Sequence, residues 1–238
     1  MSTGTKVLVV GAGEVGRSLY NVIKDSCEAE IVDKDQVSEM SPEIMHVCFP
    51  YSENFVQYVK EYVEKYKPIV TVINSTVPVG TTESLGKGFV HSPIRGKHPN
   101  LEGGIRTFTK EVGGDEPELC QMVANHFTLA GIPTMYRGLS AKNTEFAKIM
   151  CTTYYGWAIV FAKEMKKLCN EYGLDFEAVY TEWNKDYNAG YVALGMPQYF
   201  RPVLDDMPGK IGGHCVAQNC ELENNLLTRL VKEYNDKI

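Results

Sequence analysis

The chain has 238 residues, 44% of them hydrophobic and 23% charged, which is enough to bury a core in one large domain or two small ones. The formal net charge of −6 excludes the basic surface typical of nucleic-acid-binding proteins, and no apolar run approaches the roughly 20 residues of a membrane span. The 7 cysteines include no C-x-x-C pair and no signal peptide precedes the first strand, so we predict a cytoplasmic protein with no metal site, nucleic-acid partner or membrane partner.

The first predicted element is a buried strand over residues 7–10, which runs directly into a G-x-G-x-x-G loop at residues 11–16. A helix with apolar residues on one face follows, and a second strand over residues 29–32 ends at Asp33. This order of strand, glycine turn, helix, strand and acid predicts a dinucleotide-binding unit. A glycine turn in some other α/β protein is the alternative.

The chemistry of dinucleotide binding gives each glycine a role. Gly11 permits the sharp turn, Gly13 lets the backbone approach a pyrophosphate, and Gly16 lets the helix pack on the strand. The Asp33 carboxylate is expected to accept hydrogen bonds from ribose hydroxyls and to repel a 2′-phosphate, which favours NAD, although Lys34 beside it weakens this preference. The predicted cofactor contacts are Gly11, Gly13, Glu14, Val15, Gly16, Asp33, Lys34 and Thr76.

The rest of the first half alternates short apolar runs with helical patterns, which is typical of a doubly wound parallel sheet. Only a short polar connection over residues 36–42 precedes the third strand, where a full dinucleotide fold normally has another helix and strand. We expect that segment to be missing or reduced to a loop. The predicted strands cover residues 44–49, 69–73, 89–91, 109–113 and 132–136, and the predicted helices cover residues 52–66 and 116–130.

Two loops follow predicted strands on the side where parallel strands face a cofactor. The loop over residues 74–82 carries Thr76, whose hydroxyl can bond the nicotinamide ribose or a substrate oxygen. Thr81 or Thr82 is expected to cap the helix that follows. The loop over residues 92–99 carries three basic or titratable side chains and is either solvated or turned toward a substrate.

From residue 139 the pattern changes to helices only, so we predict a Rossmann-like NAD-binding domain over residues 1–138 and an all-helical domain over residues 139–238. A helix over residues 140–172 carries a broad apolar stripe with little sheet left to cover, which predicts a homodimer formed through this helix. Gly173 suits its C-terminal cap. A helix over residues 176–185, a loop of about 30 residues and a final helix over residues 221–234 complete the prediction.

Two residues of the second half are catalytic candidates. Lys148 lies inside the apolar helix, and a lysine near an apolar crevice can act as a base or an electrostatic anchor. The alternative is a surface lysine on the polar face. Cys215 follows two glycines and His214 just before the last predicted helix, where a helix N-terminus and an imidazole can activate a nucleophilic thiol. The alternative is a plain buried cysteine.

With these elements in order, the chain resembles the UDP-glucose/GDP-mannose dehydrogenase family. The resemblance rests on four stretches in the family's order: GAGEVG at residues 11–16, STVPVG at 75–80, EFAK at 145–148 and GGHC at 212–215. It spans nearly the whole chain but reaches only the family's first two domains. We therefore expect a short form without the C-terminal nucleotide-binding domain.

The family oxidises the primary alcohol of a nucleotide sugar to a carboxylate in two NAD-dependent steps, and the resemblance implies this activity here. Cys215 matches the nucleophile that holds the aldehyde as a thiohemiacetal and then as a thioester. Lys148 matches the lysine that stabilises oxyanion charge, and Thr76 matches the threonine near the nicotinamide and the catalytic water. The long helix matches the dimerisation helix. The substrate contacts implied are Thr152, Gly212, Gly213 and His214.

Four positions depart from the family pattern. Ile94 and Thr152 stand where the family usually has glutamate and asparagine, and Gln218 and Asn219 stand where it usually has lysine and aspartate. The groups that activate water for thioester hydrolysis are thereby weakened.

Two other functions stay open beside the two-step oxidation. One is a one-step hydroxyacid-type dehydrogenase, which needs Lys148 but not Cys215. The other is a catalytically degenerate, NAD-binding dimeric module. The sequence leaves three further questions open: which substrate is oxidised, whether oxidation takes one step or two, and whether a separate chain supplies the missing domain.

Overall fold

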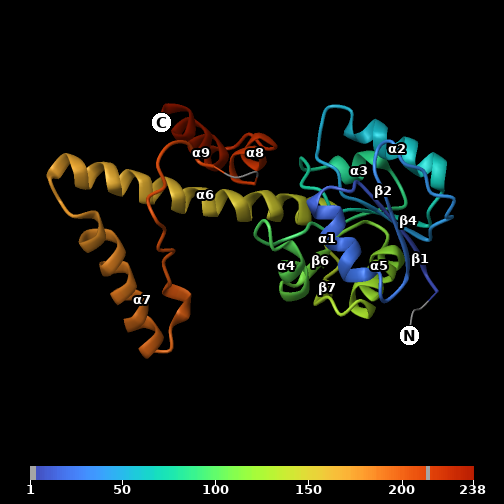
Figure 1. Ribbon diagram of the computed structural model, residues 1–238, viewed down its shortest axis with the longest axis horizontal. Coiled ribbons are helices and arrows are strands. Elements are labelled where there is room, and N and C mark those ends of the chain that lie inside the picture. Colours follow the sequence, from blue (N-terminus) through green and yellow to red (C-terminus); the bar gives the residue numbers. More distant parts are fainter. Residues whose placement is uncertain (1–3, 213–214) are drawn as a thin grey trace. The chain divides into compact units, whose positions relative to one another are not determined.

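The structure is a computed structural model that describes residues 4–212 and 215–238 (Figure 1). Backbone contacts divide the chain into two compact units, Met1–Lys148 and Ile149–Ile238. The division falls inside helix α6 (Ala141–Tyr172), whose first two turns belong to the first unit. It lies ten residues beyond the predicted boundary (148 − 138 = 10). The assignment of separate roles to two domains stays a prediction.

The first unit is built on a parallel sheet of five strands in the order β2-β1-β3-β4-β5. Alternate residues of β1 enter two different cores: Val7 and Val9 pack on one face, and Leu8 and Val10 pack on the other. A separate parallel pair joins β6 to β7. The strands are β1 (Lys6–Val10), β2 (Glu28–Val32), β3 (Ile44–Val47), β4 (Val70–Ile73), β5 (Phe89–His91), β6 (Lys110–Val112) and β7 (Thr134–Tyr136).

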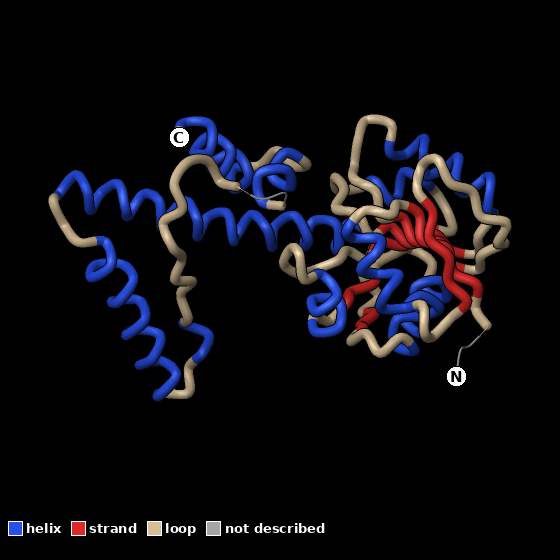
Figure 2. Tube along the Cα trace, viewed as in Figure 1, coloured by secondary structure: helices blue, strands red, loops and turns tan. Residues whose placement is uncertain are grey.

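Helices cover both faces of the five-stranded sheet (Figures 1 and 2). Side chains of α1 (Glu14–Ile23), α4 (Leu101–Thr107) and α5 (Pro117–Leu129) share the core that contains Val7 and Val9. Side chains of α2 (Phe55–Tyr66) and α3 (Thr81–Leu85) share the core on the opposite face. The predicted α/β class and Rossmann-like doubly wound sheet are therefore confirmed.

The connection between β2 and β3 is a loop, as one of the two expected possibilities. Because the strands are parallel, it runs from the carboxyl end of β2 back to the amino end of β3. Ser38 anchors it through a hydroxyl that donates to Glu30 at 2.5 Å and an N–H that donates to the Tyr66 hydroxyl at 3.2 Å. The usual helix and strand are absent from the described residues 33–43, which leaves β2 at the edge of the sheet.

Helix α4 has no counterpart among the predicted elements, because its sequence LEGGIRT contains two poor helix formers. Its glycines serve packing and capping. A Cβ at Gly104 would lie 2.6 Å from the Cα of Gly96, so only glycine allows this approach. The Asn100 side chain accepts the Gly103 N–H at 3.2 Å and caps the helix. Tertiary packing here overrides local propensity.

The second unit is helical, as predicted. The helix α6 ends at Gly173, which has the predicted left-handed conformation (φ 68°), and the Leu174 N–H donates to the Cys169 carbonyl at 2.7 Å. None of the helices in the described part of the chain is long and apolar enough to cross a membrane. The remaining elements are a π-helical turn (Glu177–Glu182), α7 (Trp183–Ala193), a 3-10 turn (Pro197–Tyr199), α8 (Val216–Glu221) and α9 (Leu226–Lys237).

Two predictions for the second unit are wrong in extent. Helix α7 continues eight residues beyond the predicted end (193 − 185 = 8), so the predicted long loop is shorter. The predicted final helix over residues 221–234 starts five residues too early (226 − 221 = 5), because a capping box begins α9, and a separate helix, α8, lies before it. In it, Asn225 Oδ1 accepts the Thr228 N–H, and Thr228 Oγ1 accepts the Asn225 N–H, both at 3.1 Å.

Candidate functional site

The glycine loop joins the carboxyl end of β1 to the start of α1. Gly11 has a φ of +100°, a conformation that suits glycine. A Cβ at Gly16 would lie 1.8 Å from the Gly11 carbonyl oxygen, so only glycine lets α1 cross the loop this closely. A Cβ at Gly13, in contrast, would meet no atom within 4 Å. The loop is therefore tightly packed behind Gly11 and Gly16 and open in front of Gly13.

The first turn of α1 offers backbone amides to an anion. Gly13 is the N-cap residue, and no side chain caps the helix there. The amides of Glu14 and Val15 follow at the helix start, where orphan N–H groups and the helix dipole favour a negative charge. The Glu14 carboxylate is turned to His98, whose Nδ1 lies 2.7 Å from it. These residues fit the pyrophosphate of a dinucleotide.

Asp33 lies exposed just beyond the carboxyl end of β2. One carboxylate oxygen accepts the Lys34 N–H at 2.9 Å, and the Asp33 N–H donates to the Gln36 side chain at 3.0 Å. These short-range bonds fix the carboxylate at the edge of the sheet where a dinucleotide fold binds ribose hydroxyls. The position is therefore compatible with the predicted role of Asp33.

The loop after β4 places Thr76 at the carboxyl end of the sheet, where it is half-buried. Ser75 is buried, and its hydroxyl donates to the Phe49 carbonyl at 2.6 Å. Beyond it, Gly80 adopts a left-handed φ of +91° at the start of α3. The loop that carries Thr76 is therefore held by a hydrogen bond at Ser75 and turns at Gly80.

A threonine cap for α3 is not what the structure has. The N-cap residue is Gly80, and the Thr81 hydroxyl donates back to the Pro78 carbonyl at 2.7 Å. The Glu145 carboxylate takes the capping role, because its two oxygens accept the N–H of Gly80 at 2.6 Å and of Thr82 at 2.8 Å. A buried glutamate from α6 replaces the expected local hydroxyl.

The loop after β5 is partly turned into the protein. Ile94 is 7% exposed and packs in the same core as Leu101 and Ile105. The buried Lys110 amino group donates to the Ser92 carbonyl at 2.5 Å. Burial, with smaller contributions from the Lys148 and Arg95 cations and against an opposing effect of Cys48, lowers the pKa of Lys110 to about 7. Ile94 is therefore a core residue, at a position where the family pattern has a glutamate.

The first unit contains three buried histidines, one each on β3, β5 and α5. His46 Nδ1 accepts the Asn74 amide at 3.1 Å, so its Nε2 donates to His126 Nε2 at 3.2 Å. Burial, reinforced by His126 and Lys110, holds the pKa of His46 well below its usual range. Burial lowers the pKa of His91 to about 3 and of His126 to about 4. All three are neutral near pH 7.

These histidines predict a loss of stability in mild acid. The unfolded state binds protons near pH 6.5 while the folded state stays neutral, so stability present above pH 6.5 falls as the pH is lowered. Each histidine is expected to cost roughly 2 kcal/mol at pH 5. Denaturant midpoints at pH 7.5 and pH 5 measure the loss, and His126→Gln should show a smaller one. Equal midpoints at both pH values would contradict the prediction.

The catalytic and substrate candidates of the second half are divided between the units. Lys148, half-buried, is the last residue of the first unit, and Cys215, also half-buried, is the N-cap residue of α8. Gly212 is exposed. Gly213 and His214 lie outside the described residues. The convergence of Lys148 and Cys215 on a nicotinamide stays a prediction.

Two of the positions that depart from the family pattern contact each other. Asn219 is buried, and its amide donates to the Thr152 hydroxyl at 3.1 Å. That hydroxyl donates in turn to the Ile149 carbonyl at 2.8 Å. Gln218, the neighbouring departure, is exposed. The second unit therefore has a neutral hydrogen-bonded pair where the family pattern has an asparagine and an aspartate.

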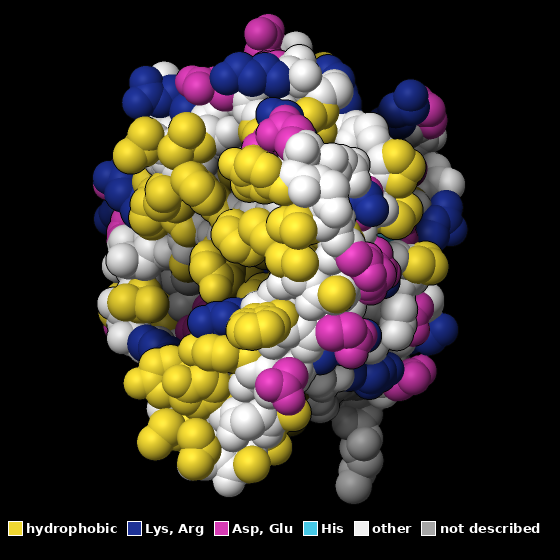
Figure 3. Space-filling model, turned by 90° about the vertical axis from the view of Figure 1, so that its left-hand side faces the viewer, with side chains coloured by type: hydrophobic (Ala, Val, Ile, Leu, Met, Phe, Trp, Pro, Cys, Tyr) yellow, Lys and Arg dark blue, Asp and Glu magenta, His cyan; other side chains and the backbone are white. Residues whose placement is uncertain are grey.

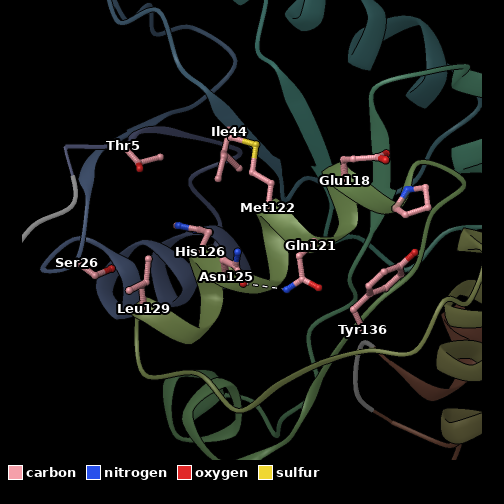
Figure 4. Close-up of a pocket in the computed structure, with 11 residues that line it drawn as sticks. Thr5, Ser26, Ile44, Glu118, Gln121, Met122, Asn125, His126, Leu129 and Tyr136 are labelled. Carbon is pink, nitrogen blue, oxygen red and sulfur yellow. Dashed lines mark hydrogen bonds between the residues drawn. The ribbon is translucent and has the colours of Figure 1, made fainter.

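A cavity of about 710 Å³ in the first unit lies away from these residues. Figure 4 shows its lining side chains, most of which come from α5, with others from β7, from the start of β3 and from the residues shortly before β1 and β2. Thr5 and Ile44 mark the amino ends of β1 and β3, whereas the glycine loop and Thr76 lie at the carboxyl ends. Parallel α/β sheets bind ligands at the carboxyl ends, so this cavity is not the dinucleotide crevice.

Sequence reasoning missed the roles of His91, Thr144 and Glu145. His91 is buried and contacts the Thr144 hydroxyl at 2.8 Å and the Ser75 carbonyl at 3.2 Å. Glu145 is 0% exposed. The available signal was a glutamate at the start of an apolar helical stripe, since a carboxylate on a buried face requires donors from another element.

Comparison with known proteins gives a family match and a relative. Residues 142–235 match the UDP-glucose/GDP-mannose dehydrogenase family, central domain. The chain is also similar to UDP-N-acetyl-D-mannosamine dehydrogenase of Methanocaldococcus jannaschii, with 24% identity over 201 residues, or 79% of this chain and 43% of the relative. The chain thus spans less than half the length of that relative. The resemblance to the family is confirmed.

Solved structures share the fold at low sequence identity. UDP-D-ManNAc dehydrogenase from Pyrococcus horikoshii has a TM-score of 0.77 and 16% identity, with 98% of this chain and 68% of that chain covered. Mycobacterium tuberculosis 3-hydroxyisobutyrate dehydrogenase has a TM-score of 0.71 and 15% identity, with 100% of this chain and 94% of that chain covered. A nucleotide-sugar dehydrogenase and a hydroxyacid dehydrogenase therefore have the same fold as this chain.

Proposed function

We propose, from the confirmed resemblance to the UDP-glucose/GDP-mannose dehydrogenase family, that this protein is an NAD-dependent dehydrogenase that oxidises the primary alcohol of a nucleotide sugar or a smaller sugar-like substrate. The observation that carries the proposal is the glycine loop, open at Gly13 and closed by Gly11 and Gly16, with Asp33 at the end of β2. The match over residues 142–235 supports the same reading for the second half. The exposed Asp33 carboxylate favours NAD over NADP, because it would repel a 2′-phosphate.

The proposed residues that hold the cofactor are those of the glycine loop and the end of β2. Backbone amides of Gly13, Glu14 and Val15 face the pyrophosphate, and Asp33 accepts the ribose hydroxyls. Thr76 lies at the carboxyl end of β4, on the side proposed for the nicotinamide ribose. When bound, NAD supplies the hydride acceptor for each oxidation.

The proposed chemistry divides the oxidation into steps that the protein's own residues assist. Loss of a hydride and a proton converts the alcohol to an aldehyde, and the Cys215 thiolate adds to the aldehyde carbon to form a thiohemiacetal. Lys148 stabilises the developing oxyanion. Loss of a second hydride and proton gives a thioester, and water then replaces the cysteine sulfur to release the carboxylate and the thiol.

The final hydrolysis is the step that this chain supports least. The Thr152–Asn219 pair is neutral, so it offers no carboxylate as a base for water. Ile94 is buried in the core and offers none either. We therefore infer slow release of the carboxylate, with the aldehyde or the Cys215 thioester accumulating first.

The experiment that tests the function incubates the protein with NAD and a panel of alcohols while NADH is followed. The panel contains UDP-N-acetyl-D-mannosamine, UDP-glucose, GDP-mannose and 3-hydroxyisobutyrate, and NADP replaces NAD in a parallel series. We expect NADH with a nucleotide sugar, and the ratio of NADH to sugar consumed distinguishes one oxidation from two. NADH binding without turnover of any substrate would favour a degenerate, cofactor-binding module.

A one-step hydroxyacid dehydrogenase is the second candidate. The observation that favours it is the shared fold, because 3-hydroxyisobutyrate dehydrogenase matches 100% of this chain with a TM-score of 0.71. That reaction would use Lys148 and no thiol. NADH from 3-hydroxyisobutyrate that persists in Cys215→Ala would support it.

We further propose a homodimer formed through α6. Tyr154, Phe161 and Leu168 are spaced by seven residues, so they lie on one face of the helix, and they are 70%, 59% and 37% exposed. Figure 3 shows exposed hydrophobic side chains close together in a space-filling view of the surface. An exposed apolar stripe of this spacing is typical of a helix that packs against another helix.

A single charge in the stripe should dissociate the dimer. Sedimentation equilibrium is expected to give twice the 26.6 kDa chain mass for the wild type and the single-chain mass for Phe161→Glu. The matched control is Leu129→Glu, because Leu129 is 62% exposed on α5 in the first unit and should not affect the mass. A wild-type protein that sediments as a monomer at micromolar concentration would rule out this interface.

A further inference from the structure

We propose that Thr144 and Glu145, on the first turns of α6, are positioning residues that hold the Ser75–Gly80 loop, and with it the Thr76 hydroxyl, at the carboxyl end of β4. This inference rests on the proposed function, since it assigns a purpose to Thr76. The residues concerned all lie in the first unit, Met1–Lys148.

Glu145 makes the tighter of the two attachments. Its side chain is 0% exposed, and its two carboxylate oxygens accept the backbone N–H groups of Gly80 at 2.6 Å and Thr82 at 2.8 Å. A buried carboxylate is tolerated only where donors of this kind surround it. Gly80 is also left-handed, at φ +91°, so the loop can turn there and present both N–H groups to one carboxylate.

Thr144 makes the second attachment through His91. The Ser75 carbonyl, 3.2 Å from His91 Nε2, can only accept, so Nε2 carries the proton. Because His91 is neutral, Nδ1 is an acceptor, and the Thr144 hydroxyl lies 2.8 Å from it. The same hydroxyl lies 2.9 Å from the Ala141 carbonyl, so its one proton is shared between the two acceptors. Ser75 directly precedes Thr76. A chain of two hydrogen bonds therefore joins α6 to the carbonyl next to Thr76.

Gly113 allows α6 to approach β5 closely. The Gly113 N–H donates to the His91 carbonyl at 2.9 Å, and the His91 N–H donates to the Gly113 carbonyl at 2.8 Å. A Cβ at Gly113 would lie 2.8 Å from the Thr144 hydroxyl oxygen and 2.7 Å from the Ser140 carbonyl oxygen. Only glycine leaves room for Thr144 to reach His91.

The two attachments lie on the two sides of Thr76. His91 fixes the carbonyl one residue before it, and Glu145 fixes the amide four residues after it (80 − 76 = 4). Thr76 itself is half-buried and makes no part of either attachment. Fixing both flanks of a short loop limits the positions that the Thr76 hydroxyl can take, and misplacement of a reacting group by about 1 Å can cost roughly 100-fold in rate.

Glu145→Gln and Thr144→Val test the proposal. The glutamine amide presents one donor to a backbone N–H, so one hydrogen bond is lost with little change of shape. The valine lacks the hydroxyl that donates to His91. We expect kcat to fall roughly 10- to 100-fold in Glu145→Gln, with the KM for NAD changed by less than about threefold. Thr144→Val should show a smaller fall of the same kind.

Glu116→Gln is the matched control. The Glu116 carboxylate also accepts a backbone N–H, that of Gly88 at 2.5 Å, but it does so before the amino end of β5, away from Thr76. A smaller loss of thermal stability is expected in Glu116→Gln, because Glu116 is half-buried, than in Glu145→Gln, and only Glu145→Gln should lower kcat. Equal kcat losses in both variants would reduce Glu145 to a general structural role and overturn the proposal.

Hydrogen exchange separates failure of this proposal from failure of the proposed function. Peptides that cover residues 75–85 should exchange faster in Glu145→Gln and in Thr144→Val than in the wild type or in Glu116→Gln, with or without a substrate. Unchanged exchange in those peptides would overturn the positioning role even if the protein is an active dehydrogenase. Faster exchange in a protein that never forms NADH would leave the attachment intact and remove its catalytic purpose.

Discussion

Replacing Gly16 with alanine is expected to abolish dinucleotide binding and to destabilise the first unit. The added methyl would lie 1.8 Å from the Gly11 carbonyl oxygen and 3.3 Å from the Cys48 Cβ. The backbone carbonyl cannot rotate away as a flexible side chain can, so α1 must shift from β1. Overpacking of this kind costs about 1–3 kcal/mol or more, and the shift also displaces the amides that face the pyrophosphate. Denaturant unfolding and NADH fluorescence titration measure the two effects.

Gly13→Ala is the control that separates packing from binding. A Cβ there meets no atom within 4 Å, and Gly13 has an ordinary φ of −71°, so the fold should keep its stability. The methyl would nevertheless stand where the backbone approaches the pyrophosphate. We expect NADH affinity to fall at least roughly tenfold, which is about 1.4 kcal/mol, with an unchanged unfolding midpoint. Wild-type affinity in both variants would exclude the glycine loop as the cofactor site.

Replacing Cys215 with alanine is expected to abolish carboxylate formation. Without the thiol there is no covalent capture of the aldehyde, and removal of an essential nucleophile typically costs roughly three orders of magnitude or more in kcat. NADH affinity should stay at the wild-type value, because Cys215 contributes to the reaction and not to the glycine loop. The measurements are carboxylate product by mass spectrometry and NADH release on the substrate found in the panel.

Cys151 provides the matched control in the same unit. It is an exposed cysteine on α6, so Cys151→Ala removes a reactive thiol without touching α8. We expect this variant to keep full activity, and an acyl adduct on the intact wild-type protein should map to Cys215 alone. Full two-step oxidation by Cys215→Ala would contradict the covalent route and favour the one-step hydroxyacid reaction.

The long-range contacts of the candidate site explain why sequence reasoning reached some of its residues and missed others. Thr76 was predicted because it follows a buried strand at the carboxyl end of a parallel sheet, a rule that depends on local order alone. Glu145 was named only within a motif, because its partners Gly80 and Thr82 precede it by more than sixty positions (145 − 82 = 63). The hydrophobic periodicity of a single segment cannot predict a hydrogen bond to a residue so distant in the sequence.

The helices and strands also divide into those that local sequence predicts and those that depend on long-range contacts. The alternation of Val7, Leu8, Val9 and Val10 between two cores was predictable, because a period of two is a property of any strand. Helix α4 was not, because its glycines oppose helix formation locally and are required only by the approach of Gly104 to Gly96. The break before α9 was readable in principle from the capping box that begins at Asn225.

The sequence by itself determined the strand–glycine loop–helix–strand unit, the doubly wound sheet and the helical second half, because each depends on spacing between near neighbours in the chain. Only the tertiary structure decided that Ile94 turns into the core, that Asn219 pairs with Thr152, and that Glu145 caps α3. The last two outcomes each satisfy a buried polar group with a partner from a distant segment. These pairings depend on the free energy of burying polar groups in the complete fold. A local sequence pattern therefore does not predict them.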